Sequence, residues 1–418
     1  MLNDRSVREH PDETLVGLRR RHAGPDAERA LEQWLTLDAG RRETATRRDA
    51  LARRVAELRA AGSTAGPDLR AAEHELRAVD EALVVVAAQA RRTLQRLPNL
   101  PDARVPEGDE PEHNVELRRW GEPPAFDFAP KRHDEIGAAL GILDLPRATR
   151  LSGPRFPLLI GAGARLARAL ASFMLDLHAT HGYVEIAPPH LLKTATLEGT
   201  GHLPRFADDL YTVPRDDLWL SPTAEAQLVA LHAGETLPEA RLPLAYTACA
   251  PAFRREAGSA RSATRGLIRQ HQFDKVELVR IATPATADTA FDAILAESEE
   301  VLRRLGLAYR VVALCAGDLP FASQRTLDLE VWMPGQDRYV EIASISDCGP
   351  FQSRRLNIRY KPSTSARARH PHTLNGSALP IGRTLAALLE SGQCADGSVA
   401  LPDALAAYAG MRTIDPSR

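Results

Sequence analysis

The chain has 418 residues, of which 44% are hydrophobic and 26% charged, a composition typical of folded domains that excludes a largely disordered chain. Its 53 Lys and Arg and 55 Asp and Glu give a formal net charge of −2, so any nucleic-acid binding must depend on a local patch rather than on a global positive field. The four cysteines form no CxxC pair, so we expect neither zinc nor a secreted disulfide framework.

The first segment of the chain, MLNDRSVREHPDE, is charged where a signal peptide would be apolar. The longest apolar stretches are far shorter than the roughly 18 residues that a membrane span needs. We therefore expect a cytoplasmic protein with no membrane contact.

Residues 27–96 are rich in Ala, Leu, Arg and Glu and contain a single proline, Pro67. This texture predicts two long helices joined by AGSTAGPD, that is, a helical hairpin. In the second helix, apolar residues alternate spacings of three and four, which places them on one seam of a coiled coil. The seam residues are Leu69, Ala72, Leu76, Val79, Leu83, Val86 and Ala90. The first helix offers Leu51, Val55 and Leu58 to this seam.

The polar faces of the hairpin carry many arginines interleaved with glutamates. One interpretation is a solvated helix face with ion pairs inside each helix. The other follows from length: a hairpin this long cannot bury its outer faces against itself, so it projects or packs on a partner. A projecting arm could bind a ligand as large as tRNA.

Between Leu97 and Gly153 the texture changes to a Pro- and acid-rich connector, PNLPDARVPEGDEPEHN, in which helix is disfavoured. We place a domain boundary near residue 110, which gives an N-terminal domain at 1–110 and a second domain at 111–418. In the second domain, Leu166, Leu170 and Leu177 recur at helical spacing, and residues 284–305 and 379–390 also have helical character. Short β-branched segments predict a largely antiparallel sheet: YVEIAPP, LYTV, LPLAYTACAP, KVELVRI, YRVVALCAG, LDLEVWMPG and RYVEIASIS. The predicted fold class is α+β.

The densest polar segment runs from Phe253 to Glu277, between two apolar strands. A loop of this length is usually flexible or functional. Its arginines, Arg254 and Arg269 among them, carry planar guanidinium groups that suit phosphate or carboxylate. This segment therefore predicts an anionic substrate.

Within this segment, FRREAGSA and TRGLIRQHQFDKVELV resemble the second signature motif of bacterial-type seryl-tRNA synthetases, which are class II aminoacyl-tRNA synthetases. Further segments resemble the family in the same order: PNLPDARVPEGDEPEHNVELRRWGEP, GPRFPLLIGAGARLARALASFMLDLHATHGYVEIAPP, SPTAEAQL, LEVWMPGQDRYVEIASISDCGPFQSRRLNIRY and HTLNGSALPIGRTLAALLE. The likeness covers nearly the whole chain. It implies a class II catalytic domain, with an antiparallel sheet flanked by helices, in a homodimer that joins serine to tRNA(Ser) in protein biosynthesis.

The implied reaction forms seryl adenylate from ATP, so the site must neutralise several negative charges and align the attack. By resemblance, Arg254 contacts the α-phosphate and the serine carboxylate, whereas Arg383 reaches the γ-phosphate. Taken without the motif, Arg254 could be a surface ion pair and Arg383 a helix-surface residue. Glu256 and Phe273 match the residues that bind and stack on adenine, although Phe273 alone would more often be core.

The resemblance also implies Mg²⁺ as a cofactor that bridges the phosphates, held by Glu341 and Ser344, with few protein oxygens and several water or phosphate ligands. The full ATP site that it implies consists of Arg254, Glu256, Arg269, Phe273, Glu341, Ile342, Ala343, Ser344 and Arg383.

The implied serine pocket consists of Thr223, Glu225, Arg254, Glu277, Asn375 and Ser377. A pocket that pairs a hydroxyl leaves its own polar groups unsatisfied when alanine binds, and so rejects alanine.

In the family, the hairpin arm reaches the long variable arm of tRNA(Ser), where arginines contact phosphates without reading sequence. The arginines that we expect to bind tRNA are Arg47, Arg48, Arg54, Arg70 and Arg77.

The chain departs from the family pattern beside the active site. Ala343 stands where the family usually has serine, and Ala378 and Pro380 stand where it has glycine and alanine. We expect Ala343 to remove a hydroxyl near the nucleotide. A second copy that serves antibiotic self-resistance or specialised metabolism would explain these changes, and so would a diverged housekeeping enzyme.

Two further alternatives stay open. One is a ligase that loads amino acids onto a carrier protein, and the hairpin counts against it because such relatives lack the arm. The other is a catalytically silent tRNA-binding paralogue, and the retained Arg254, Glu256, Glu341 and Arg383 count against that.

Overall fold

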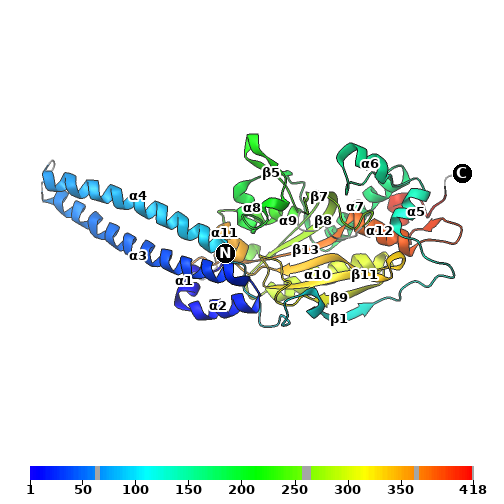
Figure 1. Ribbon diagram of the computed structural model, residues 1–418, viewed down its shortest axis with the longest axis horizontal. Coiled ribbons are helices and arrows are strands. Elements are labelled where there is room, and N and C mark those ends of the chain that lie inside the picture. Colours follow the sequence, from blue (N-terminus) through cyan, green and yellow to red (C-terminus); the bar gives the residue numbers. More distant parts are fainter. Residues whose placement is uncertain (62–65, 257–264, 362–366, 417–418) are drawn as a thin grey trace. The chain divides into compact units, whose positions relative to one another are not determined.

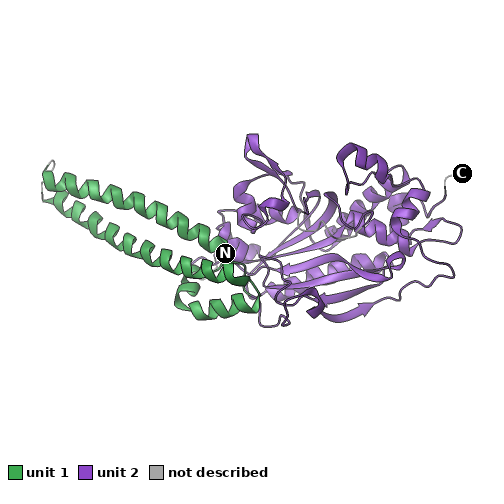
Figure 2. Ribbon diagram, viewed as in Figure 1, with its two compact units in different colours: residues 1–100 green, residues 101–418 purple. Residues whose placement is uncertain are grey.

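A computed structural model of the chain describes residues 1–61, 66–256, 265–361 and 367–416. The chain forms two compact units, residues 1–100 and 101–418 (Figure 2). Parts of the predicted hairpin turn and of the polar segment after Phe253, residues 62–65 and 257–264, lie outside the described residues. Within the described ranges, no helix has the length and apolar character of a membrane span.

The described part of the first unit is helical (Figure 1). Its helices are α1 (Asp4–Glu9), α2 (Pro11–Arg20), α3 (Gly24–Ala60) and α4 (Pro67–Gln95). The last two are the arms of the predicted hairpin. Val55, Leu69 and Ala72 form a buried cluster between them, while Leu83 and Val86 on the same seam are only half-buried. The seam is therefore buried near the turn, partly open at Leu83 and Val86, and buried again at Ala90.

Ion pairs join the two arms of the hairpin. Arg47 lies 2.6 Å from Glu75 and Arg59 lies 2.7 Å from Glu73, each on the opposite arm. Arg48 likewise pairs with Asp80. The expectation of ion pairs inside each helix is thus wrong for Arg47 and Arg59, whereas Arg48 also pairs with Asp49 on its own helix. Facing positions of an antiparallel hairpin bring opposite charges within reach across the seam.

The second unit is built on an eight-stranded sheet in the order β1-β9-β10-β11-β13-β8-β7-β2. Neighbouring strands pair antiparallel except β2 with β7. The predicted antiparallel sheet is therefore confirmed. In spatial order the strands are β1 (Val115–Trp120), β9 (Tyr309–Ala313), β10 (Arg325–Met333), β11 (Arg338–Asp347), β13 (His372–Pro380), β8 (Gln272–Ala282), β7 (Leu244–Phe253) and β2 (Val184–Glu185).

Smaller sheets and helices complete this unit. The remaining strands are β3 (Leu191–Lys193), β4 (Thr212–Val213), β5 (Leu218–Leu220), β6 (Thr236–Pro238), β12 (Arg359–Lys361), β14 (Val399–Ala400) and β15 (Thr413–Ile414). The helices are α5 (His133–Ala139), α6 (Leu145–Ser152), α7 (Ala162–Thr180), α8 (Thr194–Thr200), α9 (Ala224–Ala230), α10 (Ala287–Arg304), α11 (Phe351–Arg355), α12 (Ile381–Ser391) and α13 (Asp403–Ala409). Helices α7, α10 and α12 bury apolar side chains such as Leu170, Phe291 and Leu385 in one core with the sheet.

Three local expectations need correction. Helix is not disfavoured throughout the stretch that follows the hairpin, because α5 and α6 form at its end, where the Asp144 carboxylate caps α6 by accepting from the Arg147 amide at 2.8 Å. Strand β8 already begins at Gln272, so the end of the polar segment is strand rather than loop. The residues before α12 form strand β13, which sequence periodicity had not indicated.

Candidate active site

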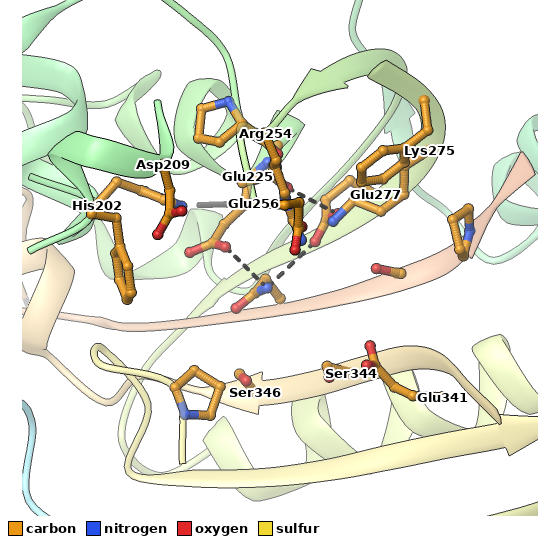
Figure 3. A pocket seen from close by; sticks show the side chains of 18 of the residues that line it. His202, Asp209, Glu225, Arg254, Glu256, Lys275, Glu277, Glu341, Ser344 and Ser346 are labelled. Carbon is orange, nitrogen blue, oxygen red and sulfur yellow. Dashed lines mark hydrogen bonds and ion pairs between the residues drawn. The ribbon is translucent and has the colours of Figure 1, made fainter. Parts of the chain in front are cut away.

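A cavity of about 640 Å³ lies on the second unit and is lined from β8, β11 and β13, which are neighbours in the sheet. Figure 3 shows Glu341, Ser344 and Ser346 along one strand, across the cavity from Glu225 and Glu277. Segments far apart in the sequence are thus brought together because their strands pair side by side.

A β-bulge on β11 sets which of its side chains reach the cavity. Leu329 of β10 pairs with Ala343, whereas the next residue, Glu330, pairs with Glu341, so Ile342 is the extra residue. An extra residue reverses the alternation of side chains along a strand. Glu341 and Ser344 therefore both line the cavity although they are three residues apart.

A second bulge does the same on β13. Ser377 pairs with Glu277 and Leu379 pairs with Val276, which leaves Ala378 as the extra residue. Consequently Ser377 and Pro380, again three residues apart, both line the cavity, whereas Ala378 is fully buried in the core.

Two carboxylates meet around one amide at one end of the cavity. Nδ2 of Asn375 lies 3.3 Å from Oε2 of Glu225 and 3.4 Å from Oε1 of Glu277. Gln352 donates to the other oxygen of Glu225 at 2.6 Å, and Thr223 donates to Glu277 at 3.3 Å. Burial raises the pKa of both carboxyl groups above the usual glutamate value.

Lys275 and His202 also line the cavity. Lys275 is buried and forms an ion pair with Glu277, and its charge counteracts the rise in the pKa of that carboxyl group. Burial, together with the charges of Arg254 and Lys275, lowers the pKa of His202 to about 3, so its ring is neutral at physiological pH.

Two of the arginines that line the cavity are held by backbone carbonyl groups. Nε of Arg254 donates to the Pro222 carbonyl at 3.1 Å, and its guanidinium lies 5.3 Å from the ring centroid of Phe273. Arg383, on the first turn of α12, donates from Nε to the Ile268 carbonyl at 3.0 Å. Both guanidinium groups are oriented by bonds to backbone carbonyls, which is how a fixed anion site is built.

Glu256 and Arg269 form an ion pair of 3.2 Å at the side of the cavity that Phe273 also lines. The backbone of Glu256 has φ of +53°, an uncommon conformation for a residue with a side chain. Such conformations concentrate at functional sites.

Oxygen donors converge where β11 faces Arg383. Nη1 of Arg383 lies 3.3 Å from Oε1 of Glu341, and this positive charge lowers the pKa of the carboxyl group. Oγ of Ser344 lies 2.5 Å from Oδ1 of Asp328 on the neighbouring strand. Burial, with the Glu341 charge in addition, raises the pKa of Asp328 well above its usual value.

The cavity brings together all the residues expected to bind serine and ATP except one. Ala343 lies in the apolar core with 2% of its surface exposed and is not among the residues that line the cavity. Ordinary alternation along the strand explains this, since Ser344 and Ser346 line the cavity and Ala343 and Ile345 face the core. Sequence reasoning also missed Asp328 and Gln352, for which no local signal exists, and gave no role to Lys275 within the recognised DKVE segment.

The expected tRNA-binding arginines lie on α3 and α4 of the first unit. Arg54, Arg70 and Arg77 are exposed. Arg47 and Arg48 are engaged in the ion pairs that join the arms.

The comparisons with known proteins agree with this fold and cavity. The family model of the tRNA synthetase class II core domain (G, H, P, S and T) matches residues 211–392. This match and the antiparallel sheet with its cavity define a class II aminoacyl-tRNA synthetase.

Relatives that match over the full chain show which family of this class the chain belongs to. A serine–tRNA ligase of Sorangium cellulosum is 48% identical, and the alignment covers 99% of each chain. The crystal structure of seryl-tRNA synthetase from Pyrococcus horikoshii complexed with ATP superposes with a TM-score of 0.93 at 31% identity over 100% of each chain. That of the cytoplasmic serine–tRNA ligase of Naegleria fowleri in complex with AMP gives a TM-score of 0.85 at 26% identity, covering 98% of this chain and 96% of that one. The chain belongs to the serine–tRNA ligase family.

Proposed function

We propose that this chain uses the cavity to join serine to ATP, forming seryl adenylate and pyrophosphate, and then transfers the seryl group to the terminal ribose of tRNA(Ser). The observation that carries the proposal is the division of one cavity into a carboxylate end and a guanidinium end. The buried pair Glu225 and Glu277 occupies the first, and Arg254 and Arg383 occupy the second. A zwitterionic amino acid and a polyphosphate fit these charges.

The carboxylate end would bind the ammonium and hydroxyl groups of serine. Glu225 and Glu277 supply negative charge to the ammonium group, and Thr223, Asn375 and Ser377 supply short polar side chains to the hydroxyl. An amino acid without the hydroxyl would leave these buried groups unpaired, so alanine would be rejected by orders of magnitude.

The guanidinium end would bind the phosphates of ATP. The charge of Arg254 also acts on Glu225 at the carboxylate end, so Arg254 can contact both the serine carboxylate and the α-phosphate as the carboxylate oxygen attacks phosphorus and pyrophosphate leaves. Adenine would stack on Phe273 beside the ion pair of Glu256 and Arg269. Catalysis then consists of alignment and charge neutralisation, with no protein nucleophile.

Glu341 and Ser344 would hold Mg²⁺. The donor set fits a hard cation: a carboxylate on the cavity wall and a hydroxyl whose proton points to Asp328, which leaves its lone pairs free. The cation would neutralise charge on the phosphates.

We further propose that an N-terminal domain of residues 1–110 contacts tRNA(Ser) through the hairpin arm, that residues 111–418 form the catalytic domain, and that the enzyme acts as a homodimer. Support for the arm comes from the exposed arginines on α3 and α4. Phosphate contacts of this kind give affinity without sequence reading.

The test is a charging assay with purified protein, Mg²⁺, ATP, labelled serine and tRNA(Ser). We expect Arg254→Ala to lower kcat/KM by about two to three orders of magnitude, the cost of removing one donor to developing charge. Arg254→Lys should recover little, because an ammonium group cannot bridge two oxygens as a planar guanidinium does. Arg255→Ala is the matched control, since Arg255 stacks on Tyr211 outside the cavity. Absence of charging by the unaltered protein would exclude the proposal and favour a carrier-loading or silent paralogue.

A further inference from the structure

His133 is a fully buried histidine at the start of α5 that lies outside the cavity wall. Its Nε2 accepts a hydrogen bond of 3.0 Å from the backbone amide of Leu267. Its Nδ1 lies 2.6 Å from Oε1 of Glu390 on α12, which is also fully buried. Because Nε2 accepts, the ring proton resides on Nδ1 and is donated to Glu390. The imidazole therefore links α12 to the chain at Leu267.

Glu390 is held rigidly at the other side of the ring. Its carboxylate also accepts from the backbone amides of His133 at 3.1 Å and of Gly335 at 2.9 Å, and from the Gln336 side chain at 3.2 Å. A buried carboxylate with this many fixed donors has little freedom to move. It thus fixes the ring that faces Leu267.

Leu267 precedes the backbone group that orients Arg383. The carbonyl of Ile268 accepts from Nε of Arg383, and Arg383 and Glu390 are seven residues apart, two turns along one face of α12. The segment Leu267–Ile268 is therefore attached to α12 at two points: through Arg383 at its first turn and through His133 and Glu390 at its last.

Gly266 shows how closely the ring and this segment fit. A Cβ atom at residue 266 would lie 2.2 Å from Nε2 of His133, and the backbone there has φ of +66°. Both observations require glycine. The histidine thus fills the space against the segment as well as bonding to it.

We propose that His133 is a positioning residue for ATP: it holds Leu267–Ile268 so that the Ile268 carbonyl orients the Arg383 guanidinium toward the phosphates. This inference rests on the proposed role of the cavity in binding ATP. The effect should fall on ATP and not on serine, because Glu225, Glu277 and Asn375 make no bond to this segment.

Two substitutions test separately the hydrogen bonds that the His133 ring forms with Glu390 and with Leu267. In His133→Asn the amide can still donate to Glu390 but cannot reach Leu267, whereas in His133→Gln the longer side chain can present an acceptor to Leu267. We expect His133→Asn to raise the Kd of Mg²⁺-ATP and the KM for ATP about tenfold, the effect of one buried hydrogen bond, and to leave the KM for serine unchanged. His133→Gln should stay within about threefold of the unaltered protein. Equal Kd values for His133→Asn and the unaltered protein would overturn the proposal, as would equal rises in both KM values.

The unaltered protein provides a second measurement that does not depend on variants folding. Hydrogen exchange at the Leu267 amide should be slow without ATP and slower with it, and exchange as fast as that of an exposed amide would overturn the proposal. Failure of the proposed function is distinguishable, because ATP binding by equilibrium dialysis tests His133 even if the protein charges no tRNA.

Discussion

Glu341 and Ser344 face the same cavity although they are three positions apart on one strand. In an unbroken strand, side chains three apart point to opposite faces. The extra residue Ile342 restores them to one face, while Ala343, next to Ser344, points to the opposite face and into the core. The site that we assign to Mg²⁺ therefore depends on a backbone irregularity as much as on the two side chains.

Removal of the Ser344 hydroxyl tests this assignment. We expect Ser344→Ala to raise the Mg²⁺ concentration needed for half-maximal charging by about tenfold, because a cation with few protein ligands loses one of them. Titration of activity with Mg²⁺ at fixed ATP measures the effect. Ser346→Ala is the matched control, because Ser346 lines the same cavity from the same strand but bonds to Thr326. If the two variants need the same Mg²⁺ concentration, Ser344 is not a ligand.

The contrast between Ala343 and the hairpin seam shows what the sequence could predict. The spacing of Leu69, Ala72 and Val79 depends only on helix periodicity, and these residues are buried as expected. Motif order likewise indicated which residues gather in the cavity. Motif likeness assigns the consecutive residues Glu341, Ile342, Ala343 and Ser344 to one site, and alternation places Ala343 on the face opposite to Ser344. The bulge that brings Glu341 to the cavity leaves no local signal, because a two-residue alternation cannot show where one residue is added.

Bonds between distant segments were equally invisible. The contacts of Gln352 with Glu225 and of His133 with Leu267 depend on how the sheet and helices are assembled. The Pro-rich stretch predicts no helix, so the short helices α5 and α6 that follow it are not predicted. A proline is nevertheless tolerated in the first turn of a helix, and α6 has one there.

Serine binding should weaken as the pH falls. The weakening should begin at a higher pH than it would if the glutamates of the pocket had ordinary pKa values. Burial raises the pKa values of Glu225 and Glu277, and only their ionised forms pair with the serine ammonium group. As the pH decreases toward these raised values, both groups take up protons and kcat/KM for serine should decline. His202, with a pKa of about 3, stays neutral and does not contribute.

Lys275→Met should make kcat/KM for serine decline at a still higher pH. The Lys275 charge counteracts the raised pKa of Glu277, so its removal should move the acid limb of the kcat/KM profile for serine to higher pH. Lys193→Met, on an exposed position of β3, is the control. An acid limb at the same pH in both variants would contradict the assignment of Glu277 to the ammonium group.

Arg54 and Arg77 should contribute to tRNA binding more than Arg47 and Arg48, since the latter are engaged by Glu75 and Asp80. We expect Arg54→Ala and Arg77→Ala each to raise the KM for tRNA several-fold and to reduce the slope of affinity against salt concentration by about one phosphate contact. Serine-dependent ATP–pyrophosphate exchange should be unchanged. The control is Arg19→Ala. Arg19 is exposed, lies on α2 outside the hairpin and pairs with Glu28. Unchanged tRNA kinetics in both arm variants would exclude this face of the hairpin.

Pro380 separates the two explanations for the departures from the family pattern. It lines the cavity three residues before Arg383, whereas Ala343 lies in the core. If the chain is a self-resistance copy, Pro380→Ala should increase inhibition by a non-hydrolysable analogue of seryl adenylate, because the change frees backbone that Pro380 holds rigid. Ala343→Ser should leave inhibition unchanged and lower the free energy of unfolding by about 1–3 kcal/mol, the cost of a buried unpaired hydroxyl. Inhibition of the unaltered protein at the same concentration as a housekeeping enzyme would remove the self-resistance hypothesis and leave a diverged housekeeping enzyme.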